Sequence, residues 1–395
     1  MFLFYMKPIY LTTIAPIIRG LCINTSGQPW VVIHGSGAGT IPPESLVIDI
    51  GAAITENQTF DEDAAAKIFR EAHTAWEFEI APAGVEAMVQ TKTVMKEPSC
   101  VVVKTQDTVN GFYWIDRDID AARKRMQERN ASFLEQPLPL INQPNPPNMN
   151  AASRTEVVRN KVALVTGGAE GLGAEIAHSL AASGGLVYVA DICQEEAERR
   201  AALINAGEKR TAAIPLQVSM SDEGSVEAMF QAVAETTGGL DLCICGAETI
   251  RSGSMLEQEL DDFKLITNIN YTGFFLMTKY AGLLLRGQHR TAPNWKTDII
   301  QINSRLGLQG EAKNSADSGG KFGALGLIAS FALELIEYNI KVNAVCPGAF
   351  SFEPRIPMKR GCTGMDVMRA LYYIIEQEYE TGQALPVTGG TVMLH

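Results

Sequence analysis

A hydroxyl, a carboxylate and an ammonium lie close together in one stretch of the sequence, and such groups could between them handle a proton. Asp317 lies thirteen residues after Ser304 and four residues before Lys321. Residues four apart on a helix share a face, so we expect Asp317 and Lys321 to form an ion pair. That pair would lower the pKa of the Asp317 carboxyl and occupy the lysine. With an ordinary pKa of about 4, an aspartate is a poor proton donor and a weak base at neutral pH.

Three glycines form a second group with possible chemistry, in the run TGGAEGLG. Gly167, Gly171 and Gly173 give the pattern T-G-x-x-x-G-x-G between a predicted strand and a predicted helix. Glycines at such a turn let the backbone approach a pyrophosphate, whose charge the helix N-terminus stabilises. Asp191 ends the next predicted strand about twenty residues later, the offset typical of a ribose contact. Its carboxylate would repel a 2′-phosphate and so favours NAD over NADP, while a glycine turn without a ligand is the alternative.

These residues need a scaffold of strands and helices, and the sequence from residue 159 onward predicts one. Short apolar runs rich in β-branched residues indicate buried parallel strands. The runs are KVALVTG, LVYVADI, TAAIPLQV, LDLCICGA, TDIIQINS, IKVNAVCPG and QALPVTGG. Helical segments fall between them, including residues 171–184, 195–207, 261–286 and 321–339. This alternation predicts an α/β fold with a doubly wound parallel sheet of the Rossmann type.

A proline-rich stretch separates this part from the N-terminal part. Residues 134–150 hold five prolines, which remove backbone donors and disfavour helix, so we place a linker at 134–158 between domains at 1–133 and 159–395. Strands at PWVVIHGSG, SLVIDIG and SCVVVKT, with helices at 61–79 and 117–130, predict a smaller α+β N-terminal domain. Lys7-Pro8 and Pro16 interrupt the first 22 residues, so we expect a buried or poorly defined element there and no targeting or membrane-spanning segment.

The order of these motifs resembles the short-chain dehydrogenase/reductase family over residues 159–395. By resemblance, Asn270 holds a proton-relay water, Ser304 orients the substrate oxygen and Lys321 binds the nicotinamide ribose. Pro347-Gly348 match the turn beside the nicotinamide, and Asp317 occupies the fourth catalytic position. The tail YETGQALPVTGGTVML, with TDIIQINS, resembles the branch that contains sorbitol-6-phosphate 2-dehydrogenase, some of whose members carry an aldolase-like domain.

Three features depart from the family pattern. The position of the family's proton-transferring tyrosine is Asp317, and the family's Asn-Ala-Gly is replaced by Gly246-Ala247-Glu248, which adds bulk and negative charge beside an anionic ligand. Ser219 also replaces an acid that commonly touches the adenine. The segment after Gly348 is shorter than the family's substrate-covering segment, which would weaken water exclusion and specificity. The resemblance assigns cofactor binding to Gly167, Gly171, Gly173, Asp191, Ala247, Lys321, Pro347 and Gly348.

The N-terminal part resembles the start of a class II aldolase/adducin domain over residues 20–75, and faintly over 99–128. In that family an Asn-x-Ser strand and a Ser-Gly turn contact phosphate, and Asn24, Ser36 and Gly37 match those positions. The family holds a divalent metal, usually zinc, with a His-x-His pair and a later histidine. None of the five histidines forms such a pair, so we predict no metal site and no aldol cleavage. We interpret His34 and His73 as packing or surface residues.

Composition limits the partners. The formal charge of −12 argues against nucleic acid and against an anionic membrane surface. A small-molecule substrate is what the family resemblance implies. A phosphorylated sugar would require local positive groups, which the total charge does not reveal. The seven cysteines are scattered in mostly apolar runs, typical of reduced thiols in the cytoplasm, and we interpret Cys243 and Cys245 as plain strand residues. The resemblance implies a homo-oligomer.

Two hypotheses of function remain open. One is an NAD-linked oxidoreductase of a sugar alcohol or sugar phosphate, in which Ser304 and Asn270 hold the substrate oxygen and a water does the acid–base work. The other is a non-catalytic protein that keeps a dinucleotide fold for binding or assembly. The second is favoured because the tyrosine, the covering segment, the Asn-Ala-Gly motif and the metal ligands are all missing.

Overall fold

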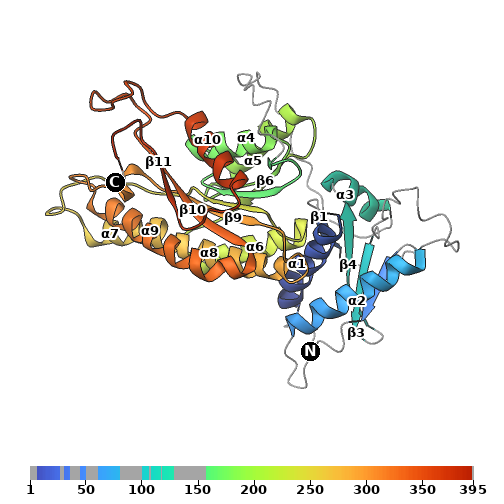
Figure 1. Ribbon diagram of the computed structural model, residues 1–395. Helices are drawn as coiled ribbons and strands as arrows, with labels where there is room; N and C mark the ends of the chain where they lie inside the picture. Colours follow the sequence, from blue (N-terminus) through green and yellow to red (C-terminus); the bar gives the residue numbers. More distant parts are fainter. Residues whose placement is uncertain are drawn as a thin grey trace. The chain divides into compact units, whose positions relative to one another are not determined.

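The computed structural model describes residues 7–26, 31–35, 45–49, 61–80, 100–105, 108–116, 118–128 and 157–393 (Figure 1). The chain forms two compact units. The first comprises the N-terminal part together with residues 231–239 and 287–295, and the second comprises the rest of the C-terminal part. Almost all of the predicted linker lies outside the described residues, and Val158 at its end is buried in the core of the second unit.

The second unit is built on a seven-stranded sheet in the order β11-β10-β9-β8-β5-β6-β7. Every recorded strand pair in it is parallel. The strands are β5 Val162–Thr166, β6 Leu186–Asp191, β7 Ala213–Gln217, β8 Leu242–Cys245, β9 Thr297–Ile302, β10 Ile340–Pro347 and β11 Ala384–Val387. The central strands are buried on both faces, as their continuous apolar runs predict. The predicted doubly wound α/β fold is therefore confirmed.

Helices cover both faces of this sheet. Figure 1 shows α4, α5 and α10 on one face and α6, α8 and α9 on the other. The helices are α4 Gly171–Ala182, α5 Gln194–Glu208, α6 Glu223–Thr237, α7 Leu260–Thr267, α8 Gly273–His289, α9 Ser315–Leu335 and α10 Gly364–Glu376. The single helix predicted for 261–286 is divided, because a π-helical turn, η4 Asn268–Thr272, separates α7 from α8.

Helix α9 runs into a short 3-10 turn, η6 Ile336–Tyr338. Together they form the one helix of the described residues, Ser315–Tyr338, that is long and apolar enough to cross a membrane by length and composition. Core helices pass the same test. Since α9 packs along β10 and buries Asp317 and Lys321, we interpret it as a core helix of this unit.

The strand order decides where a site can form. The chain proceeds from β5 outward to β7 and then returns to β8 on the other side of β5, so the order reverses between β5 and β8. In open α/β sheets ligands bind outside the carboxyl ends of the strands at such a point. The carboxyl ends of β5, β8, β9 and β10 carry Thr166, Cys245, Ile302 and Pro347, each within two residues of a predicted site residue.

The first unit contains a four-stranded sheet in the order β1-β4-β3-β2. Its elements are α1 Lys7–Ser26, β1 Val31–Gly35, β2 Ser45–Asp49, α2 Glu62–Ile80, β3 Cys100–Thr105, β4 Thr108–Asp116 and α3 Ile119–Glu128. The three predicted strands and two predicted helices are present, and β4 was not predicted. Within this unit Arg290 pairs with Glu62 at 2.8 Å and with Asp63 at 2.9 Å, which links residues 287–295 to α2.

The phosphate-contacting strand expected at Asn24 is absent, because Asn24 lies in the last turns of helix α1. The buried residues Ile14–Ile23 continue the helix across Pro16 and give this segment its apolar side. Ser36 and Gly37, the other two expected positions, lie outside the described residues. His34 lies in β1 and His73 in α2.

Candidate active site

The glycine run between β5 and α4 forms a tight turn. Gly167 and Gly171 have φ angles of 65° and 51°, which favour glycine. A Cβ atom on Gly173 would lie 2.0 Å from the carbonyl oxygen of Gly167, so only glycine lets the helix approach the turn this closely. Helix α4 begins at Gly171 and directs its unpaired amide groups toward this end of the sheet. The turn therefore has the geometry of a pyrophosphate cradle.

Asp191 at the end of β6 holds the glycine turn from the side. Its Oδ2 atom accepts a hydrogen bond from Ala169 N at 3.2 Å, and its Oδ1 atom accepts one from Cys193 N at 3.2 Å. The carbonyl oxygen of Ala169 in turn accepts a hydrogen bond from Arg200 Nε at 3.0 Å. A carboxylate has about four acceptor positions, so Asp191 keeps capacity for a ribose hydroxyl.

The turn after β8 lies against the turn after β5. The Thr166 hydroxyl oxygen accepts hydrogen bonds from Gly246 N at 3.1 Å and from Ala247 N at 3.3 Å. A Cβ atom on Gly167 would lie 3.0 Å from Ala247 Cα. The structure thus brings Ala247 beside the glycine turn at the switch point of the sheet, where the resemblance places a cofactor contact. The hydroxyl of Ser219, at the predicted adenine end, lies 3.3 Å from that of Ser221.

Asn270 lies in the π-helical turn, and its side-chain amide is fixed on both sides. Its Oδ1 atom accepts from Thr249 N at 2.9 Å, and its Nδ2 group donates to Thr249 O at 2.9 Å. The same Nδ2 group donates to Asp317 Oδ1 at 2.9 Å. Irregular turns of this kind often occur at functional sites. Here the turn aims Asn270 at the residue that occupies the tyrosine position.

Asp317 lies in the first turn of α9 and is buried, with 3% of its surface exposed. Its Oδ2 atom is buried and has no hydrogen-bond partner among the described residues. Burial, as the main cause, raises the pKa of the Asp317 carboxyl, and the nearby charge of Glu248 raises it further, against opposing effects of Lys321 and Asn270. The expectation of a lowered pKa was therefore wrong, because the loss of water outweighs the neighbouring ammonium.

Lys321 forms its ion pair with Glu248 and not with Asp317. The Nζ atom lies 2.5 Å from Glu248 Oε2, with the lysine side chain 3% exposed and the glutamate side chain 41% exposed. A second contact joins Nζ to Ile302 O at 3.5 Å. The pair predicted from the spacing of four was wrong, because Glu248, far away in sequence, reaches the ammonium at the carboxyl end of β8.

Ser304 begins a short 3-10 turn, η5 Arg305–Gly307, by accepting a hydrogen bond from Leu306 N at 3.1 Å. Asn303, which the sequence analysis missed, holds this region together. Its Oδ1 atom accepts from Ser304 N at 2.7 Å, and its Nδ2 group donates to Lys321 O at 3.1 Å. A polar residue at the end of a buried strand, directly before Ser304, is the signal that could have identified it.

Ion pairs fix the short segment that follows Gly348. Arg355 pairs with Glu311 at 2.7 Å and with Glu353 at 2.5 Å. Arg305, at the start of η5, also pairs with Glu311 at 3.1 Å. Since Ile356 in the same segment is buried, this stretch is tied to the loop after Ser304 on one side and to the body of the unit on the other. It lies against the site as a short fixed strap.

Comparisons with known proteins agree with this geometry. Residues 161–359 match the family model described as short chain dehydrogenase. The chain is 33% identical over 263 residues to sorbitol-6-phosphate 2-dehydrogenase of Escherichia coli, covering 59% of this chain and 99% of that protein. It is 31% identical over 248 residues to trans-4-hydroxycyclohexanecarboxylate dehydrogenase of Sinomonas cyclohexanicum, covering 59% and 93%.

Two solved structures are similar to the same part of the chain. The crystal structure of sorbitol-6-phosphate 2-dehydrogenase from Erwinia amylovora has a TM-score of 0.55 and 34% sequence identity, and the match covers 59% of this chain and 100% of that one. A short-chain dehydrogenase/reductase from Mycobacterium marinum has a TM-score of 0.56 and 26% identity, covering 60% and 98%. The matched part in each case is about three fifths of this chain.

Proposed function

The chain belongs to the short-chain dehydrogenase family, and on that premise we propose that it is an NAD-linked oxidoreductase of a sugar alcohol or sugar phosphate. The observation that carries the proposal is the glycine cradle with Asp191 beside it. Because Gly173 has no Cβ, helix α4 packs against Gly167 O, which brings the helix N-terminus to the turn where a pyrophosphate would bind. The Asp191 carboxylate beside this turn disfavours a 2′-phosphate. The likeness to sorbitol-6-phosphate 2-dehydrogenases supports a polyol or its phosphate as substrate.

The residues of this chain would bind and orient the substrate oxygen, while bound NAD would supply the hydride acceptor. Ser304 uses its oxygen to accept from Leu306 N, so its hydroxyl proton remains available for a substrate oxygen. Asn270 keeps the buried Asp317 in place. Burial raises the pKa of Asp317 and so brings it closer to neutral pH than the pKa of an exposed aspartate. The carboxyl is therefore better suited to exchange a proton with a water in the site.

A second proposal is that the protein binds a dinucleotide, or takes part in an assembly, without catalysing a reaction. The ion pair between Lys321 and Glu248 favours it. The lysine that resembles the ribose-binding residue of the family is neutralised by a carboxylate of the same chain. A bound dinucleotide would have to displace Glu248 or share the ammonium with it. A protein of this kind would keep the cradle for weak dinucleotide binding or for assembly.

A fluorescence titration with NADH, followed by an assay with sorbitol 6-phosphate, separates the two proposals. The first expects saturable NADH binding, weaker NADPH binding, and slow NAD-dependent oxidation of the polyol phosphate. NADH binding without any turnover would support the second proposal. Absence of binding of either dinucleotide would overturn the first.

We also propose a homo-oligomer located in the cytoplasm. Helices α8 and α9 carry exposed apolar side chains, Phe275 and Leu283 on α8 and Phe322 and Leu333 on α9, which a second copy of the chain could cover. Light scattering at several protein concentrations tests this, and a monomer at all of them would reject it. For the N-terminal part we propose an origin in a class II aldolase-like domain, without aldolase activity.

A further inference from the structure

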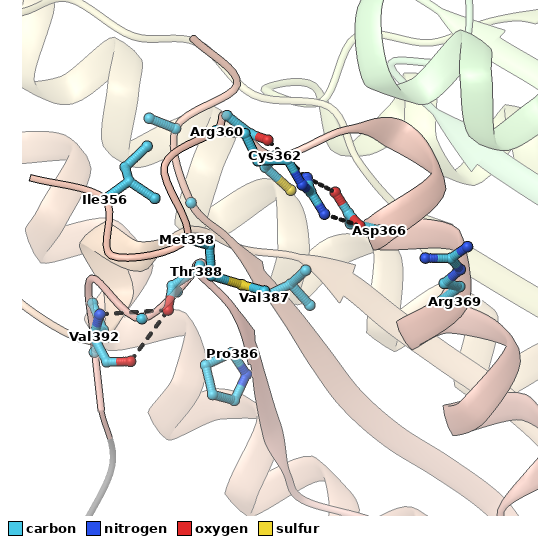
Figure 2. Close-up of a pocket in the computed structure, with 15 residues that line it drawn as sticks. Ile356, Met358, Arg360, Cys362, Asp366, Arg369, Pro386, Val387, Thr388 and Val392 are labelled. Carbon is cyan, nitrogen blue, oxygen red and sulfur yellow. Dashed lines mark hydrogen bonds and ion pairs between the residues drawn. The ribbon is translucent and has the colours of Figure 1, made fainter. Parts of the chain in front are cut away.

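A pocket of about 510 Å³ opens at the carboxyl ends of β10 and β11. These strands run parallel, with Pro347 opposite Val387, and the turns that follow them form the pocket floor. Figure 2 shows Ile356, Met358 and Val392 on the apolar side of the pocket and Arg360, Cys362 and Arg369 on the polar side. The volume lies within the range of about 300–1,000 Å³ that is usual for small-molecule sites.

The two arginines of the pocket differ in what they bind. Arg360 donates two hydrogen bonds to the carboxylate of Asp366, at 2.6 and 2.9 Å, and Asp366 also accepts from the Thr363 hydroxyl at 2.7 Å. Arg369 lies one helical turn further along α10, lines the same pocket and is exposed. No hydrogen bond or ion pair of Arg369 is recorded among the described residues. Because Asp366 neutralises Arg360, the positive charge of this pocket comes from the guanidinium of Arg369.

This charge contrasts with the protein as a whole, whose formal charge is −12. Most of the acidic surface would repel an anionic ligand, and a favourable electrostatic interaction would require a local cation. Guanidinium groups bind phosphate with paired, charge-assisted hydrogen bonds, and an arginine at a pocket wall is well placed to do so. The apolar wall of Ile356, Met358 and Val392 could cover a short carbon chain.

The pocket adjoins the candidate active site along β10. Cys346 is buried near the end of this strand, and burial raises its thiol pKa to about 12, against the smaller opposing effects of the nearby Lys321 charge and a backbone hydrogen bond from Ser304. Gly348, two residues later, lines the pocket. Gly348 N donates to Val387 O at 3.0 Å, so the same turn separates the site from the pocket. Gly348 is therefore shared between the pocket and the candidate site, whereas Ser304 does not line the pocket.

We propose that this pocket binds the phosphate group of a phosphorylated polyol, with Arg369 as the direct contact and Arg360 held in place by Asp366. The assignment rests on the proposed function, because it names the charged end of the substrate for the same site. It accounts for how an acidic protein could hold a dianionic substrate. It also makes sugar phosphates, and not free sugar alcohols, the preferred ligands.

Isothermal titration of the full-length protein with sorbitol 6-phosphate, in the presence and absence of NAD⁺, tests the proposal. Sorbitol and inorganic phosphate serve as comparison ligands. We expect sorbitol 6-phosphate to bind at least tenfold more tightly than sorbitol, and Arg369→Ala to weaken it about tenfold, as one charge-assisted hydrogen bond would. Arg369→Lys should retain part of the affinity because it keeps the charge but not the paired geometry.

Arg199→Ala is the matched control, since it removes one exposed arginine that pairs with Glu196 on α5. This control should bind sorbitol 6-phosphate as the wild type does. Equal binding by wild type and Arg369→Ala, or no binding of sorbitol 6-phosphate under either condition, would overturn the proposal. If the protein binds no dinucleotide but binds sorbitol 6-phosphate through Arg369, the dehydrogenase proposal fails and the phosphate pocket stands.

Discussion

Lys321 binds Glu248 at 2.5 Å, although Asp317 lies only one helical turn away on the same helix. The ammonium is buried, and the glutamate that neutralises it comes from the turn after β8. Within the described part of the chain, the Asp317 carboxylate is left with a single hydrogen bond, from Asn270. The charge that a dinucleotide ribose would meet in this family is thus already compensated within the chain.

Glu248→Ala should increase the affinity for NADH about tenfold or more. The substitution removes the carboxylate that competes for Lys321 and takes away bulk beside the cradle. Without ligand the variant should melt at a lower temperature, because a buried ammonium then lacks its partner. Bound NADH should raise the melting temperature of the variant again, and a thermal shift assay with and without NADH measures this.

Glu257→Ala serves as control for this substitution, because Glu257 is an exposed glutamate nine residues further along the chain and the variant removes the same charge. Its NADH affinity should match that of the wild type. If Glu248→Ala binds NADH no more tightly than this control, the pair with Lys321 does not limit cofactor binding.

Asp317→Asn should stabilise the protein at neutral pH, by about 1.4 kcal/mol for each unit by which burial raises the carboxyl pKa, because the variant removes the charge whose burial is costly. Since burial raises the folded-state pKa of Asp317 above its unfolded value of about 4, the folded state holds the proton more tightly. The contribution of this carboxyl to stability is therefore complete below the unfolded pKa and is lost as the pH rises toward the folded pKa.

Denaturant unfolding of wild type and Asp317→Asn across this pH range measures the effect. The difference in unfolding free energy should be small below a pH of about 4 and should grow toward neutral pH. Asparagine keeps the hydrogen bond from Asn270 and also leaves one polar atom without a partner, so the comparison isolates the charge. A difference that does not change with pH would contradict the raised pKa.

The double variant Asp317→Tyr with Glu248→Ala should oxidise sorbitol 6-phosphate faster than either single variant. A tyrosine supplies the acid–base group, and the second change releases the lysine that would lower its pKa. General acid–base catalysis contributes about 10²–10⁴-fold, which sets the scale of the gain. NADH absorbance follows the rate. Equal rates for the double variant and Asp317→Tyr alone would assign the remaining defect to the short strap after Gly348.

Gly173→Ala should abolish dinucleotide binding and lower the melting temperature. Its Cβ atom would lie 2.0 Å from Gly167 O, so either the helix or the turn must move. Gly326→Ala, in α9, places a methyl group where no atom lies within 4 Å and should change neither property for the worse. Retained NADH binding by Gly173→Ala would show that the cradle is not the dinucleotide site.

The sequence alone was sufficient for the layout of the second unit. Apolar runs rich in β-branched residues predicted all seven strands, because a strand buried on both faces requires them. The glycine turn and Asp191 were also predictable, since their geometry depends on neighbours close in sequence and on one strand end. The strand β4 was missed although Phe112, Tyr113, Trp114 and Ile115 favour a strand, whereas the π-helical turn at Asn270 carries no strong local signal.

Only the tertiary structure decided how the charged groups pair. Spacing favours Asp317 for Lys321, but a local pair on a helix is worth only about 0.2–0.5 kcal/mol, and the fold brings Glu248 to the ammonium instead. Burial then reverses the direction of the Asp317 pKa shift. The pocket that joins Arg360 and Arg369 to the turn at Gly348 is likewise created by the packing of β10, β11 and α10, since distance in space, and not in sequence, sets the strength of electrostatic interactions.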